Sequence, residues 1–183
     1  VPLLLFLDTW TEYLHPALGR AAVRVLEAAG YHVLLVPQLR CCGRPLLSKG
    51  LVEEARRHAV HNARALAPYV AQGIPVIGIE PSCILTLRDE YLALLPERAG
   101  AQQLADHSFT IEEFLLRHVQ TAALPLDLRP THGTLLLHGH CHQKALVGME
   151  PTRALLQRLA GCTVHEIDAG CCGMAGSFGY EAE

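Results

Sequence analysis

The sequence has no long hydrophobic run and no cluster of basic residues. Its longest apolar stretches are about as long as a strand, well short of the ~20 residues that a membrane-spanning helix needs. The net charge is −3, and binding to nucleic acid is therefore not expected. The chain lacks the charged start and small-residue cleavage site of a signal peptide. It opens on Val1 rather than Met, and we interpret it as part of a longer protein.

Two cofactor-binding motifs are also missing. The chain has no Cys-x-x-Cys-x-x-Cys run, so ferredoxin-type clusters are not expected within it. The glycine-rich stretch near its end lacks the Lys-Ser/Thr pair of a phosphate-binding loop, which argues against nucleotide binding. Seven cysteines are nevertheless present. An odd number of cysteines without a secretory signal favours a reducing compartment, and metal ligands rather than a disulfide framework.

Apolar segments of strand length alternate with segments of helical periodicity. We predict strands at 3–7, 31–36, 74–79, 134–137 and 162–167. Helices are predicted at 16–30, from a cap at Ser48 to Gly73, at 84–95, at 110–118 after a Thr110–Glu113 capping box, and at 151–161. Residues 96–107 and 122–132 are expected to be connections. Such alternation is typical of βαβ units with parallel sheets, and the predicted fold class is therefore α/β.

The order strand, helix, strand and Cys-Cys-Gly occurs twice. It ends first at Cys41-Cys42-Gly43 and then, at nearly the same spacing, at Cys171-Cys172-Gly173. A repeat of this kind decides the architecture. We therefore predict two pseudo-repeated lobes, residues 1–121 and 122–183, each with a CCG turn at the carboxyl end of a strand. The second lobe is expected to be truncated at its C-terminus.

Six cysteines follow predicted strands, where parallel α/β sheets place their binding sites. They are Cys41, Cys42, Cys83, Cys141, Cys171 and Cys172. The seventh, Cys162, starts a strand and is expected in the core. Neighbouring side chains diverge on a strand but can converge in a turn, and the glycines near position 173 permit that turn. Thiolates suit iron–sulfur clusters, zinc or copper(I), although inert buried cysteine pairs also occur.

With these motifs the chain resembles the cysteine-rich CCG-domain family. The stretches 138–146 and 170–181 carry most of the resemblance. That family includes the cluster-binding subunit of heterodisulfide reductase, the glycolate oxidase iron–sulfur subunit, a subunit of anaerobic glycerol-3-phosphate dehydrogenase and the C-terminal iron–sulfur part of FAD-linked D-lactate-type dehydrogenases. The resemblance implies a 4Fe–4S cluster or its non-cubane form, held by Cys141, Cys171 and Cys172 in the second repeat and by Cys41, Cys42 and Cys83 in the first.

The resemblance also shows where the first repeat departs from the family pattern. The opening cysteine of the repeat falls within residues 8–11, which contain none, and a Cys-x-x-Cys turn has become Glu80-Pro81-Ser82-Cys83. Glu80, water or a substrate atom is therefore expected at an open iron. His140 and His142 flank Cys141. One of them is expected to act as a ligand of the metal or to donate a hydrogen bond to a sulfur of the site. Gly43 and Gly173 complete the residues expected around the cofactor.

The function implied is iron–sulfur electron transfer within an FAD-linked oxidoreductase that acts on a 2-hydroxy acid such as D-lactate or glycolate. The FAD is expected on another domain or subunit, beside a ferredoxin-type cluster domain, with a quinone or another acceptor receiving the electrons. The expected location is cytoplasmic, at the inner face of the membrane through partners. This stretch alone is expected to lack dehydrogenase activity, and handling in air is expected to give an apo form.

Two alternatives from other classes remain open. Cys141, Cys171, Cys172 and one histidine could form a structural zinc site of the Cys₃His type. The CCG cysteines could also exchange electrons as disulfides, although thiol redox modules normally use Cys-x-x-Cys, which is absent here.

Overall fold

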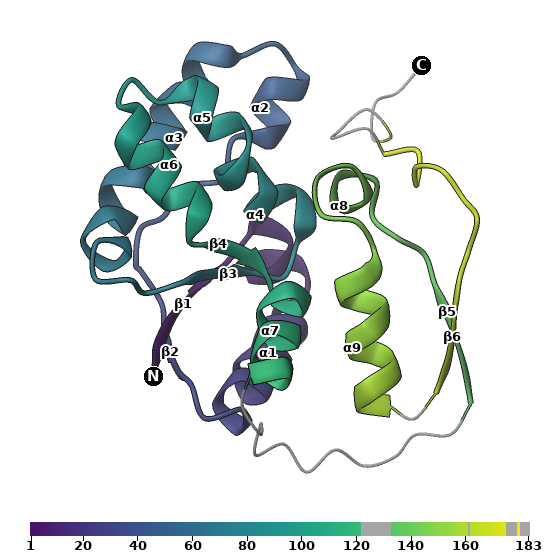
Figure 1. Cartoon of the computed structure of the whole chain (residues 1–183). Helices are drawn as coiled ribbons and strands as arrows, with labels where there is room; N and C mark the ends of the chain where they lie inside the picture. Colours follow the sequence, from purple (N-terminus) through teal and green to yellow (C-terminus); the bar gives the residue numbers. More distant parts are fainter. Residues whose placement is uncertain (122–132, 161, 175–178, 180–183) are drawn as a thin grey trace.

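A computed structural model describes residues 1–121, 133–160, 162–174 and 179 (Figure 1). Two parallel sheets organise them. The larger has the strand order β2–β1–β3–β4, and the smaller pairs β5 with β6. The strands are β1 (Pro2–Phe6), β2 (His32–Leu34), β3 (Val76–Gly78), β4 (Ser108–Thr110), β5 (Thr134–Leu137) and β6 (Thr163–Glu166). The predicted α/β class with parallel strands is confirmed.

Helices cover both faces of the larger sheet (Figure 1). They are η1 (Trp10–Leu14, a π-helix), α1 (Pro16–Ala28), α2 (Arg44–Ser48), α3 (Val52–Val70), α4 (Pro81–Arg88), α5 (Glu90–Leu94), α6 (Arg98–Asp106), α7 (Ile111–Thr121), α8 (Cys141–Leu146) and α9 (Glu150–Ala160). Leu4 and Phe6 of β1 pack with α3 to α6, whereas Leu3 and Leu5 pack with α1 and α7. Burial on both faces explains why β1 is a continuous apolar run.

The smaller sheet is attached to the larger one through helices. Leu155 of α9 joins the core cluster that contains Phe114 and Leu115 of α7. Helix α8 in turn packs against α4. The two strand–helix–strand units therefore share a helical interface, and the carboxyl ends of their strands lie on the same side of it (Figure 1). Among the described residues, no helix combines the length and the hydrophobicity needed to cross a membrane.

Several sequence predictions need correction. Ser48 does not cap a helix: it ends α2, and its hydroxyl donates to the Arg44 carbonyl at 3.1 Å. The helix predicted at 84–95 breaks at Asp89 into α4 and α5. Residues 96–107, expected to be a connection, contain α6. Although α6 is largely polar, the apolar side chains Ala101, Leu104 and Ala105 share one buried face, and tertiary packing stabilises the helix.

Other local predictions hold or fall outside the described residues. The capping box is confirmed, because the Glu113 amide donates to the Thr110 hydroxyl at 3.3 Å and the Thr110 amide to the Glu113 carboxylate at 3.1 Å. The helix that follows is α7, and the strand β4 before it was not predicted. The predicted connection at 122–132 lies outside the described residues. The division into lobes at 121/122 stays a prediction.

Gly78 permits α4 to approach the end of β3 closely. A Cβ at this position would lie 2.3 Å from Cβ of Ile84. Side chains cannot approach so closely, so only glycine fits between strand and helix. The same approach brings Cys83, one residue before Ile84, to the end of the sheet.

We therefore predict that Gly78→Ala lowers the free energy of unfolding by about 1–3 kcal/mol, as overpacking does elsewhere. Gly100 in α6 is the matched control, because a Cβ there would meet no atom within 4 Å. Gly100→Ala should raise stability by about 0.5–1 kcal/mol through helix propensity. Urea unfolding of both variants tests this prediction, and equal effects of the two substitutions would contradict it.

Candidate functional site

The first cysteine site lies where the loop after β2 meets the start of α4. The Sγ atoms of Cys42 and Cys83 are 3.3 Å apart, although 41 positions separate them in the chain. The Cys41 thiol in turn contacts Cys42. Cys42 is only 1% exposed and Cys83 9%. The structure therefore brings together all three cysteines that the sequence analysis assigned to the first repeat, in a buried place.

A buried polar network holds the backbone of this CCG turn. Asn62 of α3 accepts from the Arg40 amide at 2.8 Å and donates to the Arg40 carbonyl at 2.9 Å. The Tyr91 hydroxyl donates to the Cys42 carbonyl at 3.0 Å and accepts from Asn62 at 3.1 Å. His58 Nδ1 lies 3.1 Å from the Cys41 carbonyl, which implies that this nitrogen carries the proton. Both Asn62 and Tyr91 are fully buried.

Sequence reasoning missed this network, although one signal was available. Asn62 lies on the helical face formed by Ala55, Ala59 and Leu66, where a polar residue is out of place unless it has a buried partner. Nothing comparable in the sequence pointed to Tyr91.

Both CCG glycines adopt the left-handed conformation, with φ of +94° at Gly43 and +85° at Gly173. The turn at Gly43 directs backbone amides at sulfur, because the Gly43 amide donates to Cys41 and the Arg44 amide to Cys42. Hydrogen bonds of this kind stabilise thiolates. Gly170, one of the glycines near position 173 that were expected to permit the turn, does not have positive φ. Gly176 lies outside the described residues.

The thiols of Cys41 and Cys42 in the first site are strongly biased toward their neutral forms. The hydrogen bond with Cys42 and burial raise the pKa of Cys41 well above its usual range. A hydrogen bond from Cys41 lowers the pKa of Cys42, but contact with Cys83 and burial outweigh it, and the pKa of Cys42 is also raised. Three clustered thiols therefore need a bound cation to become thiolates together. This donor set fits a soft metal centre.

Thr9 stands beside this site, at the end of β1. Its side chain hydrogen-bonds the Cys41 thiol. The segment is fixed by buried Asp8, which accepts from the Thr11 amide at 2.9 Å and from the Thr11 hydroxyl at 2.6 Å. Thr9 lies within residues 8–11, where the resemblance places a cysteine that this chain lacks. A hydroxyl therefore stands beside the first site where the resemblance places the opening cysteine of the repeat.

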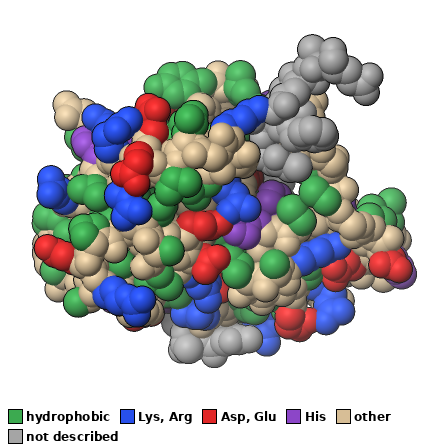
Figure 2. Space-filling view, turned by 90° about the horizontal axis from the view of Figure 1, so that it is seen from above, with side chains coloured by type: hydrophobic (Ala, Val, Ile, Leu, Met, Phe, Trp, Pro, Cys, Tyr) green, Lys and Arg blue, Asp and Glu red, His purple; other side chains and the backbone are tan. Residues whose placement is uncertain are grey.

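The second cysteine site is open to solvent. Cys141 begins α8, and its Sγ lies 3.8 Å from Sγ of Cys171. Cys172 follows in the same turn, and all three cysteines are exposed. They line a cleft of about 530 Å³ together with Trp10, Arg44, Ser48, Glu80, Ser82, His140, His142 and Met174. Figure 2 shows histidine side chains near the centre of this face, bordered by acidic and basic ones.

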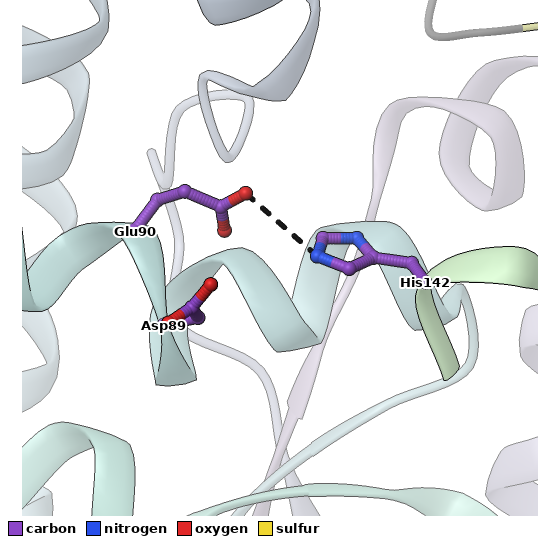
Figure 3. Close-up of side chains that lie close together, drawn as sticks. All are labelled: Asp89, Glu90 and His142. Carbon is purple, nitrogen blue, oxygen red and sulfur yellow. Dashed lines mark ion pairs between the residues drawn. The ribbon is translucent and has the colours of Figure 1, made fainter. Parts of the chain in front are cut away.

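The two histidines beside Cys141 reach toward glutamates of the first half of the chain. His140 caps α8, because its Nδ1 accepts from the His142 amide at 3.2 Å, and its Nε2 lies 3.6 Å from Glu80. His142 Nε2 lies 3.7 Å from Oε1 of Glu90 (Figure 3). Burial lowers the pKa of His142, with a further contribution from Arg44. Glu80 also accepts from the Ser82 amide at 3.0 Å, and it lies in the cleft.

Lys144 of α8 holds the segment that leads into the second CCG turn. Its Nζ donates to the Ala169 carbonyl at 2.8 Å and lies 3.9 Å from the Glu166 carboxylate. Because Lys144 and Cys141 share α8, this bond positions Cys171 over Cys141.

Comparisons with known proteins agree with this arrangement. The model of the CCG family, described as a cysteine-rich domain, matches residues 9–88. The chain is 32% identical over 179 residues to a subunit of the anaerobic glycerol-3-phosphate dehydrogenase of Escherichia coli K12, and the match covers 97% of this chain and 44% of that protein. The chain thus spans less than half of this relative.

Two further relatives carry other names. D-2-hydroxyglutarate dehydrogenase of Haemophilus influenzae is 29% identical over 184 residues, covering 96% of this chain and 17% of that protein. Lactate utilization protein A of Bacillus cytotoxicus is 27% identical over 183 residues, covering 95% of this chain and 72% of that protein. The resemblance predicted from the sequence motifs is confirmed.

We predict that Lys144→Met slows oxidative cross-linking of Cys141 to Cys171. The two sulfurs lie 3.8 Å apart in the native chain, so a small movement brings them to the ~2.05 Å of a disulfide. Without the bond to Ala169, the turn that carries Cys171 loses its anchor. Diamide treatment of the metal-free chain, followed by peptide mass spectrometry, measures the rate. Arg158→Met, with the same charge change on α9, should leave the rate unchanged, and equal rates in both variants would contradict the prediction.

Proposed function

We propose that this chain, which belongs to the CCG cysteine-rich family, is an iron–sulfur electron-transfer domain of an FAD-linked oxidoreductase. The observation that carries the proposal is the convergence of cysteines from separate segments into two sites. Cys42 meets Cys83 at 3.3 Å, and Cys141 meets Cys171 at 3.8 Å. Inert packing does not account for this convergence, because the six cysteines gather at the ends of strands and Cys162 alone lies elsewhere.

The chain's own residues prepare each site for soft metal chemistry. Cys41, Cys42 and Cys83 would hold a cluster in the first site, with the Thr9 hydroxyl beside it. Cys141, Cys171 and Cys172 would hold one in the second, with His140 and His142 at its edge. A bound iron–sulfur cluster supplies one-electron redox chemistry at a potential set by its surroundings.

Backbone amides and burial set the electrostatics of the two sites. Amide donors to sulfur stabilise negative charge, and the Gly43 and Arg44 amides provide them at the first site. At the second site the amide of His142, which directly follows Cys141, donates instead to Nδ1 of His140 at 3.2 Å. Burial around Cys42 excludes water, whereas the second site faces an open cleft. We infer that the exposed site exchanges electrons with a partner or acceptor and that the buried site stores them.

The parent reaction is also part of the proposal. The relatives are named for glycerol 3-phosphate, D-2-hydroxyglutarate and lactate. Each of these small anions carries a hydroxyl on a carbon that can be oxidised to a carbonyl. We infer that the parent oxidoreductase takes an electron pair from such a substrate, a 2-hydroxy acid being our first choice. The FAD and ferredoxin-type clusters would lie on other domains or subunits. A quinone is one candidate acceptor, and the cytoplasm is the proposed location.

A structural zinc site is the second candidate, and one observation favours it. His140 and His142 line the same cleft as Cys141, Cys171 and Cys172, so that one histidine and three thiols are available together. This is the Cys₃His donor set of structural zinc sites. Zinc is colourless, and the visible spectrum therefore separates the two candidates.

We predict that the chain purified without oxygen contains iron and labile sulfide and absorbs broadly near 400 nm. The double variant Cys42→Ser with Cys83→Ser should lose the iron of the first site and keep that of the second. The double variant Cys141→Ser with Cys171→Ser should lose the iron of the second site and keep that of the first. Cys162→Ala is the matched control, because Cys162 is buried outside both sites, and its iron content should equal that of the native chain. Metal analysis and the visible spectrum give the readout.

Zinc without colour would overturn the iron–sulfur assignment in favour of the structural site. Equal iron loss in all three variants would show that the metal depends on folding rather than on these cysteines, and circular dichroism of each variant identifies that case.

A further inference from the structure

Glu90, the first residue of α5, contacts one residue beside each cysteine site. Its Oε1 forms an ion pair with Nη1 of Arg44, and the same oxygen lies 3.7 Å from Nε2 of His142 (Figure 3). Arg44 belongs to the first half of the chain and His142 to the second. One carboxylate therefore links the two halves at the point where their cysteine sites lie.

Both residues contacted by Glu90 lie beside a site cysteine in the chain. Arg44 follows the first CCG turn, and its backbone amide donates to Cys42. His142 directly follows Cys141 in α8, and its backbone amide donates to Nδ1 of His140 at 3.2 Å. The side chains that meet at Glu90 thus belong to residues that lie next to one cysteine of each site. A continuous path runs from Cys42 through Arg44, Glu90 and His142 to Cys141.

We propose that Glu90 is a positioning residue that couples the two cysteine sites through Arg44 and His142. The proposal rests on the proposed function in that both sites bind a redox cofactor. Glu90 fixes the side chains of Arg44 and His142, and with them the backbone beside Cys42 and Cys141, and its charge contributes to the potential of each site. A change at one site then alters the geometry and electrostatics at the other, and the coupling works equally in both directions.

Burial strengthens this bridge. The side chain of His142 is 11% exposed and that of Glu90 21%. Oε2 of Glu90 and Nδ1 of His142 are both buried and have no hydrogen-bond partner among the described residues. The carboxylate of Glu90 is partly shielded from water and therefore interacts with the Arg44 guanidinium, which is 37% exposed, more strongly than in a fully exposed pair. Removing the carboxylate would leave the Arg44 cation and the His142 ring without their shared anchor.

The same side chains could instead bind a cation, but the structure favours the bridge between Arg44 and His142. Asp89, Glu90 and His142 offer ligand atoms that all lie within 4.8 Å of one another. Oε1 of Glu90 already has a cation beside it in the Arg44 guanidinium, which a metal ion would have to displace. Asp89 is also exposed, so its carboxylate is well solvated without a metal.

The first test uses the metal-free, ¹⁵N-labelled chain, so that its result does not depend on any cofactor. In Glu90→Ala the amide hydrogens of Arg44 and His142 should both exchange several-fold faster with solvent, and in Glu90→Gln the effect should be smaller because the shape is kept. Glu54→Gln is the control with the same charge change, since Glu54 pairs with Arg57 on the exposed side of α3. It should leave both amides unchanged.

The second test asks whether the effect passes through Glu90. Arg44→Met alters the first half only, yet it should shift the His142 amide resonance. In the Glu90→Gln background the same substitution should no longer do so. A response confined to one amide, or an Arg44→Met effect that persists without Glu90, would overturn the coupling. Amide resonances of α1 serve as the folding control for every variant.

The third test uses the chain reconstituted with iron and sulfide. Loss of the Glu90 charge should shift the midpoint potentials of both sites upward, because a negative charge disfavours the reduced cluster. If neither midpoint potential shifts, and Glu90→Gln gives the same potentials as Glu54→Gln, the electrostatic part of the proposal is overturned. Failure to bind iron would instead contradict the proposed function and leave the amide measurements to decide the coupling.

A separate measurement tests the cation site. If the cysteine-alkylated chain binds Zn²⁺ and Glu90→Gln abolishes that binding, then Asp89, Glu90 and His142 bind a cation and the bridge is overturned.

Discussion

The first cysteine site depends on the hydrogen bonds that Asn62 and Tyr91 make beneath its turn. A CCG turn carries backbone carbonyls into the core, and buried carbonyls without partners cost about 1–3 kcal/mol each. Asn62 and Tyr91 satisfy the carbonyls of Arg40 and Cys42. Because both side chains are fully buried, they have few alternative positions. The turn is therefore held rigidly, and with it the thiols that would otherwise have to be ordered by the metal.

The two sites differ in a way that suits consecutive steps of electron transfer. Cys42 and Cys83 lie in the hydrophobic core, where low dielectric strengthens every charge interaction. Cys141 and Cys171 are exposed in a cleft that also contains polar groups able to bind an anion or donate a proton. A buried centre is protected from water and oxygen, whereas an exposed centre can meet a partner. The same repeated unit thus produces two environments, because helices cover both faces of the sheet in the first repeat.

Much of the fold and the members of each site were predictable from sequence, because strands and CCG turns follow local rules. A continuous apolar run such as β1 predicts a buried parallel strand, and Gly43 and Gly173 mark turns that need positive φ. Helix α6 escaped prediction because its stability comes from tertiary packing rather than from its polar composition. Glu90 escaped for a related reason. Its role is defined by its contacts with Arg44 and His142, which are distant in sequence. No local sequence pattern predicts contacts of this kind.

Thr9 and Cys141 occupy corresponding positions in the two repeats but carry different side chains. Both follow the first strand of their unit, and each contacts the first cysteine of its CCG turn, Cys41 and Cys171 respectively. The two repeats therefore place corresponding residues alike, with the Thr9 hydroxyl where the second repeat has the Cys141 thiol. A neutral hydroxyl is a weaker ligand for soft metals than a thiolate, so a metal bound at the first site would be held by three sulfurs and remain open on the side of Thr9. Asp8, buried and bonded to Thr11, keeps that side in place.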